Sequence, residues 1–284
     1  MERAGKLEIL YEDEWAVAVH KPSGLLSVGF PGFRGRTAED ELKARYRSHG
    51  KVRVFAVHRL DRDTSGVMLF AKSAEARDRF MDGWQEIVSE RTYRCVCRRA
   101  PRSRELPETG TIDEPIAYNA KNVGFVPRKD DERERAAAER AVTRFRVLER
   151  GPALDLVECE LETGRKNQIR VHMAHMGHPI LGDGVYGTTE DRGADSRVHK
   201  GSQPGGMPRA ERLALHARVI AFTHPFTGDV KRFEVPEPKD FAKAVRRGAP
   251  VEEPVKRESG KPGESGRAPR SGRYANGSKF IPGK

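Results

Sequence analysis

The sequence predicts an α+β fold built on a mixed, largely antiparallel central sheet with flanking helices. Three observations lead to this prediction: strand-like runs recur along the chain, short turns join several of them, and helical patterns are few and irregularly placed. A doubly wound parallel sheet would instead alternate strands and helices regularly. No internal repeat of fixed period is present in the sequence.

The expected strands are segments in which β-branched, aliphatic and aromatic residues alternate or run together. In chain order they are Leu7–Tyr11, Trp15–His20, Val52–Val57, Val67–Ala71, Thr92–Val96, Ala141–Leu148, Leu154–Leu161 and Leu213–Phe222. Helical spacing of apolar residues predicts three main helices. These cover Thr37–Tyr46, Ser73–Trp84 and Gln168–Met176.

Two polar segments interrupt this pattern. Arg128–Arg140 is dense in charge and contains three consecutive alanines, which favours a short solvated helix or a flexible insertion between two strands, and we assign it no chemistry. Thr188–Glu211 is rich in glycine and arginine and is expected to be a surface insertion. Loops on a rigid scaffold commonly line binding clefts, so its position matters more than its composition.

The chain is expected to divide into one folded domain, residues 1–245, and a basic disordered C-terminal tail, residues 246–284. From residue 251 onward the sequence holds eight Lys or Arg, four Glu and very few aliphatic residues, so this part cannot bury enough apolar surface to fold. Its surplus of four positive charges (8 − 4) has two interpretations. The tail either binds phosphate without sequence preference or only keeps the protein in solution.

Composition indicates a polyanionic partner. The 284 residues are 36% hydrophobic, enough for a core, and carry a formal net charge of +11. Nucleic acid fits this charge better than a membrane, because neither a basic amphipathic helix nor a long apolar segment is visible. A basic composition can also serve solubility alone, so charge does not decide the question.

The cysteines and the N-terminus indicate a cytoplasmic protein. Cys95, Cys97 and Cys159 lie in strand-like runs rather than at metal-ligand spacings, and an odd, small number of cysteines suits a reducing compartment. The first residues lack the apolar stretch of a signal peptide, and Glu2 argues against a transit peptide. We also expect no separate RNA-binding module before the first strand.

Residues 58–66, His-Arg-Leu-Asp-Arg-Asp-Thr-Ser-Gly, are the most informative run of the chain. They form a charged loop between the apolar segments Val52–Val57 and Val67–Ala71. Ionised groups beside an apolar interior cost several kcal/mol unless they are paired. An Arg-Leu-Asp-Arg-Asp cluster flanked by strands is therefore a candidate functional site.

This run resembles the HRLDxxTSG motif of the pseudouridine synthases that modify ribosomal and transfer RNA, in the branch named after the large-subunit synthase A. Further segments resemble that family in the same order, from about residue 8 to residue 238. They are Lys21–Gly24, Arg91–Val96, Glu162–His172, Gly177–Asp183, Leu213–Ala217 and His224–Pro225. One departure is visible, since Asn167 stands where the family usually has histidine.

The resemblance implies an RNA isomerase whose catalytic domain is residues 1–245 and which needs no metal or cofactor. Its reaction breaks the bond between N1 of uracil and C1′ of the ribose, turns the base, and joins C5 to C1′. Asp61 occupies the family's catalytic aspartate position, where either nucleophilic attack or proton abstraction at C2′ applies, and the sequence does not choose between them. The resemblance also implies that Tyr93 stacks on the target base and takes part in removing the C5 proton, directly or through water.

A catalytic carboxylate in a dry pocket needs a cationic partner to stay ionised. Arg170 is the expected partner of Asp61, because it occupies the family's basic position near the start of a helix, and Arg165 is the competing candidate. The target nucleotide must leave its stack to react, and Arg59, two residues before Asp61, is expected to fill the vacated space. Arg62 and Arg165 are expected to contact RNA.

The inferred partner is structured RNA, a ribosomal or transfer RNA stem-loop, and neither a membrane nor an obligatory protein partner is inferred. His58 is expected to be structural, Asp63 to be solvated or paired with Arg62, and Thr64, Ser65 and Gly66 to hold the loop.

Three rival interpretations are weaker. The spacing of His172, His175 and His178 suggests a zinc site, but Gly177 and Pro179 break the helix before the third histidine. A glycoside hydrolase would need a second carboxylate in place of an arginine. An inactive RNA-binding protein on the same fold remains the main alternative, although such a protein would not need a carboxylate facing RNA.

Overall fold

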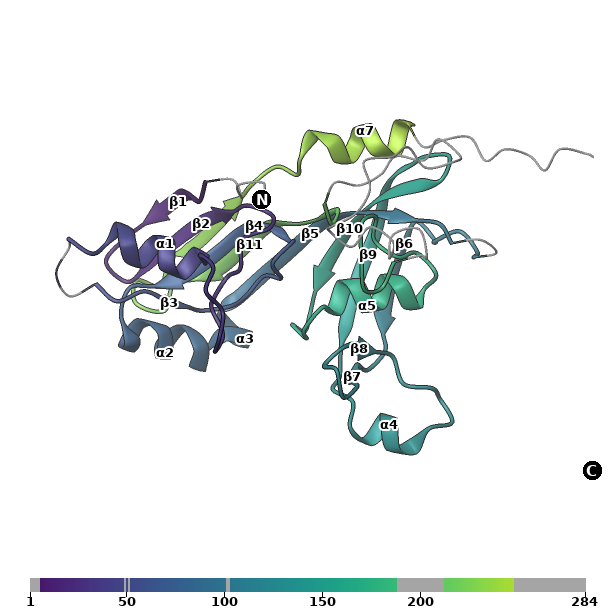
Figure 1. Ribbon diagram of the computed structural model, residues 1–284, viewed down its shortest axis with the longest axis horizontal. Coiled ribbons are helices and arrows are strands. Elements are labelled where there is room, and N and C mark those ends of the chain that lie inside the picture. The colour runs from purple at the N-terminus through teal and green to yellow at the C-terminus, as the bar shows by residue number, and fades with distance from the viewer. Residues whose placement is uncertain (1–5, 49, 51, 101–102, 188–211, 248–284) are drawn as a thin grey trace, which may run out of the picture. The chain divides into compact units, whose positions relative to one another are not determined.

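One mixed sheet organises the part of the chain that the computed structural model describes, namely residues 6–48, 50, 52–100, 103–187 and 212–247. Its main strand order is β1 (Glu8–Glu12), β2 (Ala16–Lys21), β4 (Ser65–Ala71), β11 (Leu215–Thr223), β5 (Val88–Arg98), β10 (Leu154–Leu161), β9 (Val142–Arg150) and β6 (Thr109–Asp113). β12 (Val230–Glu234) pairs with β11, and β3 (Phe55–Ala56) pairs with β4. Neighbouring strands are antiparallel except for β4 and β11, which are parallel (Figure 1). The predicted α+β fold with a largely antiparallel sheet is confirmed.

Helices cover both faces of this sheet. The described helices are α1 (Ala38–Arg45), α2 (Ala74–Asp82), α3 (Trp84–Ile87), α4 (Glu132–Ala136), α5 (Gln168–His175) and α7 (Lys239–Arg247), and α4 is not one of those that pack on the sheet. Successive residues of a strand face opposite sides of the sheet. The side chains of β2 and β4 therefore pack in two separate hydrophobic cores, one on each face. Leu42 of α1 packs with Val17 and Met68, whereas Phe80 of α2 packs with Ala18 and Leu69. None of the described helices is long and apolar enough to cross a membrane.

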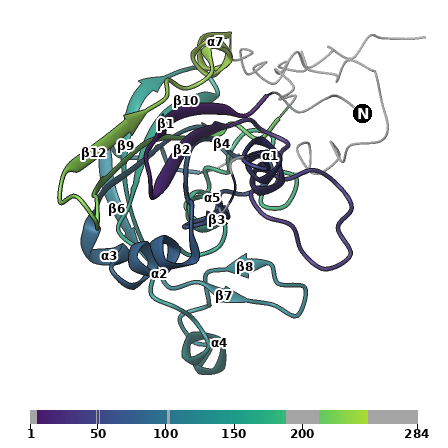
Figure 2. The ribbon, with the colours of Figure 1, turned by 90° about the vertical axis from the view of Figure 1, so that its left-hand side faces the viewer.

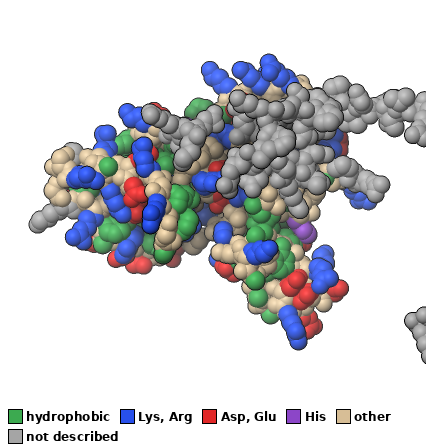
Figure 3. All heavy atoms as spheres, in the orientation of Figure 1, with side chains coloured by type: hydrophobic (Ala, Val, Ile, Leu, Met, Phe, Trp, Pro, Cys, Tyr) green, Lys and Arg blue, Asp and Glu red, His purple; other side chains and the backbone are tan. Residues whose placement is uncertain are grey.

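A small second sheet of two strands lies, together with α4, away from the main sheet. β7 (Ala117–Tyr118) pairs with β8 (Gly124–Phe125), and Figures 1 and 2 show this hairpin and α4 extending away from the main sheet. Of the two alternatives for Arg128–Arg140, a short solvated helix or a flexible insertion, the structure shows the helix, α4, which has no buried residue. Basic and acidic side chains alternate over it (Figure 3), as expected for a solvated insertion.

Several predicted boundaries are correct and others are wrong. β10 matches the predicted strand Leu154–Leu161 to the residue, and α1 begins after Thr37, whose hydroxyl accepts from Asp40 N–H in a capping box. The strand predicted at Val52–Val57 shrinks to the two residues of β3, although the Val57 N–H still donates to Leu69 O. The helix predicted at Ser73–Trp84 ends at Asp82, because Gly83 separates α2 from α3.

Two predicted segments lie largely outside the described residues. The insertion Thr188–Glu211 falls entirely there, and so does the tail from residue 248 onward. Arg246 and Arg247, the first two residues of the predicted tail, instead form the end of α7.

Candidate active site

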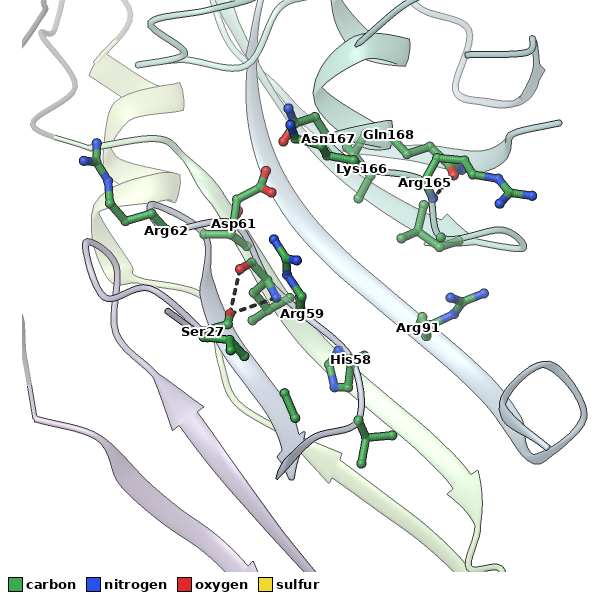
Figure 4. A pocket seen from close by; sticks show the side chains of 18 of the residues that line it. Ser27, His58, Arg59, Asp61, Arg62, Arg91, Arg165, Lys166, Asn167 and Gln168 are labelled. Atoms are coloured by element: carbon green, nitrogen blue, oxygen red, sulfur yellow. Dashed lines mark hydrogen bonds between the residues drawn. The ribbon is translucent and has the colours of Figure 1, made fainter. Parts of the chain in front are cut away.

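The motif residues gather around one cleft of about 960 Å³. Residues 55–64 form one wall, residues 164–170 form the other, and Arg91 and Tyr93 of β5 contribute to the lining. The visible surface is hollowed between the α1–α3 side and the α5 side (Figure 3), and Figure 4 shows Arg59 and Asp61 pointing into this space from one wall, with residues 165–168 on the other. Segments far apart in sequence thus form a single site.

The loop that carries Asp61 is fixed by the segment after β2. Ser27 Oγ donates to Leu60 O at 2.7 Å and accepts from Leu60 N–H at 3.1 Å (Figure 4). The carbonyl of Arg62 accepts from Gly24 N–H at 2.9 Å and from Nζ of the fully buried Lys21 at 3.0 Å. Burial lowers the pKa of Lys21 to about 7, although Asp63 and Asp61 act to raise it. The Lys-Pro-Ser-Gly turn therefore supports the loop from behind.

Gly66, the second residue of β4 after this loop, has a φ of +122°, a conformation closed to most other residues. A Cβ at this position would also collide with the backbone of Ala217 in the neighbouring strand. Ser65 is part of β4 rather than of the turn, and its hydroxyl bonds Nδ1 of the buried His216 at 2.7 Å. Arg212 Nη2 donates to the same hydroxyl at 2.7 Å. The start of β4 is thus tied to β11.

Asp61 is paired with Arg170, as the sequence led us to expect. Arg170 Nη1 donates to Asp61 Oδ2 at 3.1 Å, and both Nε and Nη2 donate to Asp183 at 2.8 Å. Burial opposes the charge of Arg170, but the hydrogen bonds and charge of Asp183, together with Asp61, outweigh it and raise the pKa of Arg170 above its usual value. The guanidinium therefore stays charged beside Asp61.

Asn167 completes the surroundings of Arg170. It adopts a left-handed backbone conformation, φ 57°, immediately before α5, and asparagine tolerates this conformation better than most residues. Its Oδ1 accepts from Arg170 Nη1 at 3.1 Å, and its Nδ2 donates to the hydroxyl of Tyr186 at 3.2 Å. The Arg170 guanidinium also lies 5.1 Å from the centre of the Tyr186 ring. Asn167, which stands where the family usually has histidine, therefore hydrogen-bonds the arginine that pairs with Asp61.

Tyr93 lies on the face of β5 that lines the cleft. Burial raises the pKa of Tyr93 to about 12, while the charge of Arg91 acts to lower it and that of Asp61 to raise it. The phenol consequently keeps its proton at neutral pH. This environment does not favour a role that requires the free phenolate.

Arg59 and His58 take different directions from adjacent positions. Arg59 is exposed and lies beside Asp61 in the cleft (Figure 4). His58 stacks on Trp84, with ring centres 5.1 Å apart, and its Nε2 accepts from Leu69 N–H at 3.1 Å. Burial, reinforced by the charge of Arg91, lowers the pKa of His58 to about 3. A neutral, hydrogen-bonded ring agrees with the structural role expected for His58.

Arg62 and Arg165 both line the cleft, and among the described residues Arg165 forms no hydrogen bond or ion pair with Asp61. Arg62 forms the expected ion pair with Asp63, at 2.9 Å from Nε to Oδ1. Arg165 forms an ion pair with Glu139, with 2.5 Å between Nη1 and Oε2, and its Nε donates to Arg140 O at 2.9 Å. Of the two arginines considered for Asp61, the structure therefore brings Arg170 to it.

The three histidines of the suspected zinc site do not converge. His172 bonds Thr143 Oγ1 at 2.9 Å and Glu114 O at 3.0 Å, and His178 Nε2 bonds Arg104 O at 2.8 Å. His175 is exposed. Within the described ranges, no group of three or more His, Cys, Asp or Glu side chains is placed to hold a metal ion.

Comparison with known proteins identifies the family of the chain. A family model for RNA pseudouridylate synthase matches residues 16–175. The uncharacterized RNA pseudouridine synthase YlyB of Bacillus subtilis is 34% identical over 243 residues, which cover 84% of this chain and 72% of that protein. Ribosomal large subunit pseudouridine synthase D of Xanthomonas campestris is 36% identical over 243 residues, which cover 84% of this chain and 68% of that protein.

A solved structure supports the fold. Human RNA pseudouridylate synthase domain containing 4 superposes with a TM-score of 0.65 at 24% identity, covering 84% of this chain and 92% of that one. The fold and site define an RNA-modifying isomerase. The chain belongs to the RNA pseudouridylate synthase family, which converts uridine in RNA to pseudouridine, and the resemblance of its motifs is confirmed.

Sequence reasoning misses the residue that holds Arg170. Asp183 stands out in the sequence only as the end of the Gly177–Asp183 match, yet its carboxylate is fully buried and forms two hydrogen bonds to the guanidinium. An acidic residue just after the apolar run Pro179–Leu181 was the available signal, since buried acids are rarely unpaired.

Proposed function

We propose that this protein isomerises one or more uridines of structured ribosomal RNA, with Asp61 as the anionic group that acts on the sugar. The single observation that carries this proposal is the contact of Asp61 with a partly buried guanidinium inside the cleft, 3.1 Å from Arg170 Nη1. The relative from Xanthomonas campestris is named for the large ribosomal subunit, which favours that RNA over transfer RNA.

The proposed roles follow from charge and position. Asp61 attacks C1′ to form a glycosyl ester or takes up the proton from C2′, and Arg170 holds its carboxylate by a hydrogen bond in the resting site. Tyr93, whose pKa burial raises to about 12, packs its neutral ring against the detached uracil and leaves C5 proton removal to a water molecule. No redox change or group transfer to a second molecule occurs, so the overall reaction consumes nothing.

Arg59 is proposed to enter the space that the extruded uridine leaves. Its exposed side chain lies beside Asp61 and carries a planar cation that can stack on bases and bond phosphate. Arg62 and Arg165, also on the rim, would contact the stem-loop backbone. We infer recognition by the folded domain of residues 1–245 without an obligatory protein partner, in the cytoplasm, where the three free buried cysteines stay reduced.

The test is tritium release from ribosomal RNA labelled at C5 of uridine. Wild-type protein should release tritium, and Asp61→Asn should lose roughly 10⁴-fold or more in rate while keeping its fold and RNA affinity. Mapping pseudouridines in ribosomal and transfer RNA from cells with and without the gene would identify the target. An inactive RNA-binding protein would bind RNA equally well but release no tritium in either form.

A further inference from the structure

Arg91 is a cleft arginine to which the proposed reaction gives no role. It lies two residues before Tyr93 on β5, so the two side chains project from the same face at positions about 6.7 Å apart along the strand. Both line the cleft. Figure 4 places Arg91 on the far side of Arg59 and His58 from Asp61, whereas Arg62 lies at the opposite end of the cleft.

The guanidinium of Arg91 is half-buried and lacks an acidic partner. Its Nη2 donates to Glu162 O at 2.8 Å, and among the described residues no carboxylate forms an ion pair with it. Burial lowers the pKa of Arg91, with Tyr93 acting in the opposite direction. A partly desolvated cation that bonds only a neutral carbonyl retains donors and attraction for an anion.

Gly164 makes room for this guanidinium. A Cβ at Gly164 would lie 2.9 Å from Arg91 Nη1, which is closer than real Cβ contacts allow. Gly164 is not among the described glycines with positive φ, so a side chain here would act by displacing the flexible end of Arg91 rather than by straining the backbone. The turn that leads through Asn167 into α5 thus lies against the Arg91 side chain.

The surface beside Arg91 suits a nucleotide. Trp84 stacks on His58, and Met81 is 53% exposed in the same cleft. Because the pKa of His58 is lowered to about 3, its ring is neutral at physiological pH and does not repel the guanidinium of Arg91. An apolar surface next to an unpaired guanidinium offers contacts to both a base and its phosphate.

We infer that Arg91 binds the RNA phosphate of a nucleotide flanking the target uridine, with Met81 and Trp84 against that nucleotide. This inference rests on the proposed function, because it takes the uridine to occupy the space between Asp61 and Tyr93. The RNA strand would then cross the cleft from Arg62 to Arg91, and the phosphate held by Arg91 would fix which uridine reaches Asp61.

The first test separates a phosphate contact from a structural role. Arg91→Gln keeps an amide donor for Glu162 O but removes the charge, and Arg246→Ala, an exposed arginine on α7, removes the same charge elsewhere. We expect Arg91→Gln to raise the Kd for unmodified RNA about tenfold in an Asp61→Asn background and to make the slope of log affinity against log salt shallower by about 0.7 to 0.9. Equal slopes for the Arg91 and Arg246 variants would overturn the inference.

The second test asks which phosphate is bound. RNAs carrying one neutral methylphosphonate at successive positions around the target should bind the parent protein less tightly at one position, and that penalty should vanish in Arg91→Gln. Gly164→Ala should weaken binding in the parent but not further in Arg91→Gln. A penalty that persists at every position without Arg91 would overturn the inference. Absence of tritium release by the wild type would instead refute the proposed function.

Discussion

Arg170 Nη1 donates a hydrogen bond of 3.1 Å to Oδ2 of Asp61, which lies 109 positions earlier in the chain. The opposite edge of the same guanidinium is occupied by Asp183, whose side chain is fully buried. Two hydrogen bonds of 2.8 Å fix the plane of the guanidinium, so the position of Nη1 relative to Asp61 depends on a residue that does not face the cleft. Asp183 is therefore a positioning residue.

Replacing Asp183 with asparagine should reduce turnover more than RNA binding. Asparagine keeps one acceptor for Arg170 but removes the charge and the second hydrogen bond, so the guanidinium can rotate away from Asp61. We expect kcat to fall by about 10²-fold with little change in KM. Tritium release measured under saturating and limiting RNA separates the two constants.

Asp63→Asn is the matched control, because this aspartate lies two residues from Asp61 and pairs with the exposed Arg62. Its kcat should stay within a few-fold of wild type. Thermal melting of both variants reports any loss of fold. Equal losses of kcat in the two variants would remove the positioning role from Asp183.

Part of this arrangement could be predicted from sequence. Asp61, Arg170 and Tyr93 stand in motifs, and short-range patterns located the strands and helices that carry them. The partner of Arg170 could not be chosen in this way, because Asp183 reaches it through the packing of α5 against a separate turn. β12 and α7 are not predicted from the sequence because polar residues dominate both: β12 has no buried residue, and in α7 charged residues outnumber the buried Phe241 and Val245.

Arg59→Ala should slow the reaction on structured RNA far more than on an RNA that already presents the uridine unpaired. The reason is that extrusion costs a few kcal/mol only when the base starts in a stack, and Arg59 is proposed to offset that cost. The measurement compares kcat/KM for tritium release on a closed stem-loop and on the same sequence with an opened loop. Arg62→Ala, also on the rim, serves as the control. Equal losses on both RNAs would exclude Arg59 from extrusion.

Acid should destabilise the fold through His216. Burial lowers the pKa of His216 to about 4, with the charges of His20 and Arg212 acting in the same direction, whereas the ring takes up protons near pH 6.5 in the unfolded chain. Between these values the unfolded state binds more protons, so the free energy of unfolding should fall as pH drops from about 6.5 to about 4. Above pH 6.5 this contribution should be fully present.

Denaturant titrations across that pH range test the assignment. His216→Asn should be less stable overall, because it alters the hydrogen bond with Ser65, yet its stability should depend less steeply on pH. His175→Asn, at an exposed histidine, should follow the wild-type pH dependence. An unchanged slope in His216→Asn would assign the acid sensitivity to other groups, of which His58 is the first candidate because burial lowers its pKa to about 3.

The C-terminal tail is proposed to hold RNA without sequence preference. Residues 251–284 carry eight Lys or Arg against four Glu, and their sequence supplies neither a catalytic motif nor enough apolar residues for a pocket wall. Ending the chain after Pro250 should therefore weaken RNA binding mainly at low salt and leave turnover at saturating RNA nearly unchanged.

Filter-binding titrations of the full-length and shortened proteins at several salt concentrations measure this effect. For each phosphate that the shortened protein no longer binds, the slope of log affinity against log salt should become shallower by about 0.7 to 0.9, because fewer counterions are released on binding. A variant in which four tail Lys or Arg are replaced by Gln keeps the length but cancels the charge surplus, and it should match the shortened protein. If full-length and shortened proteins instead give identical slopes, the tail does not bind phosphate and serves solubility alone.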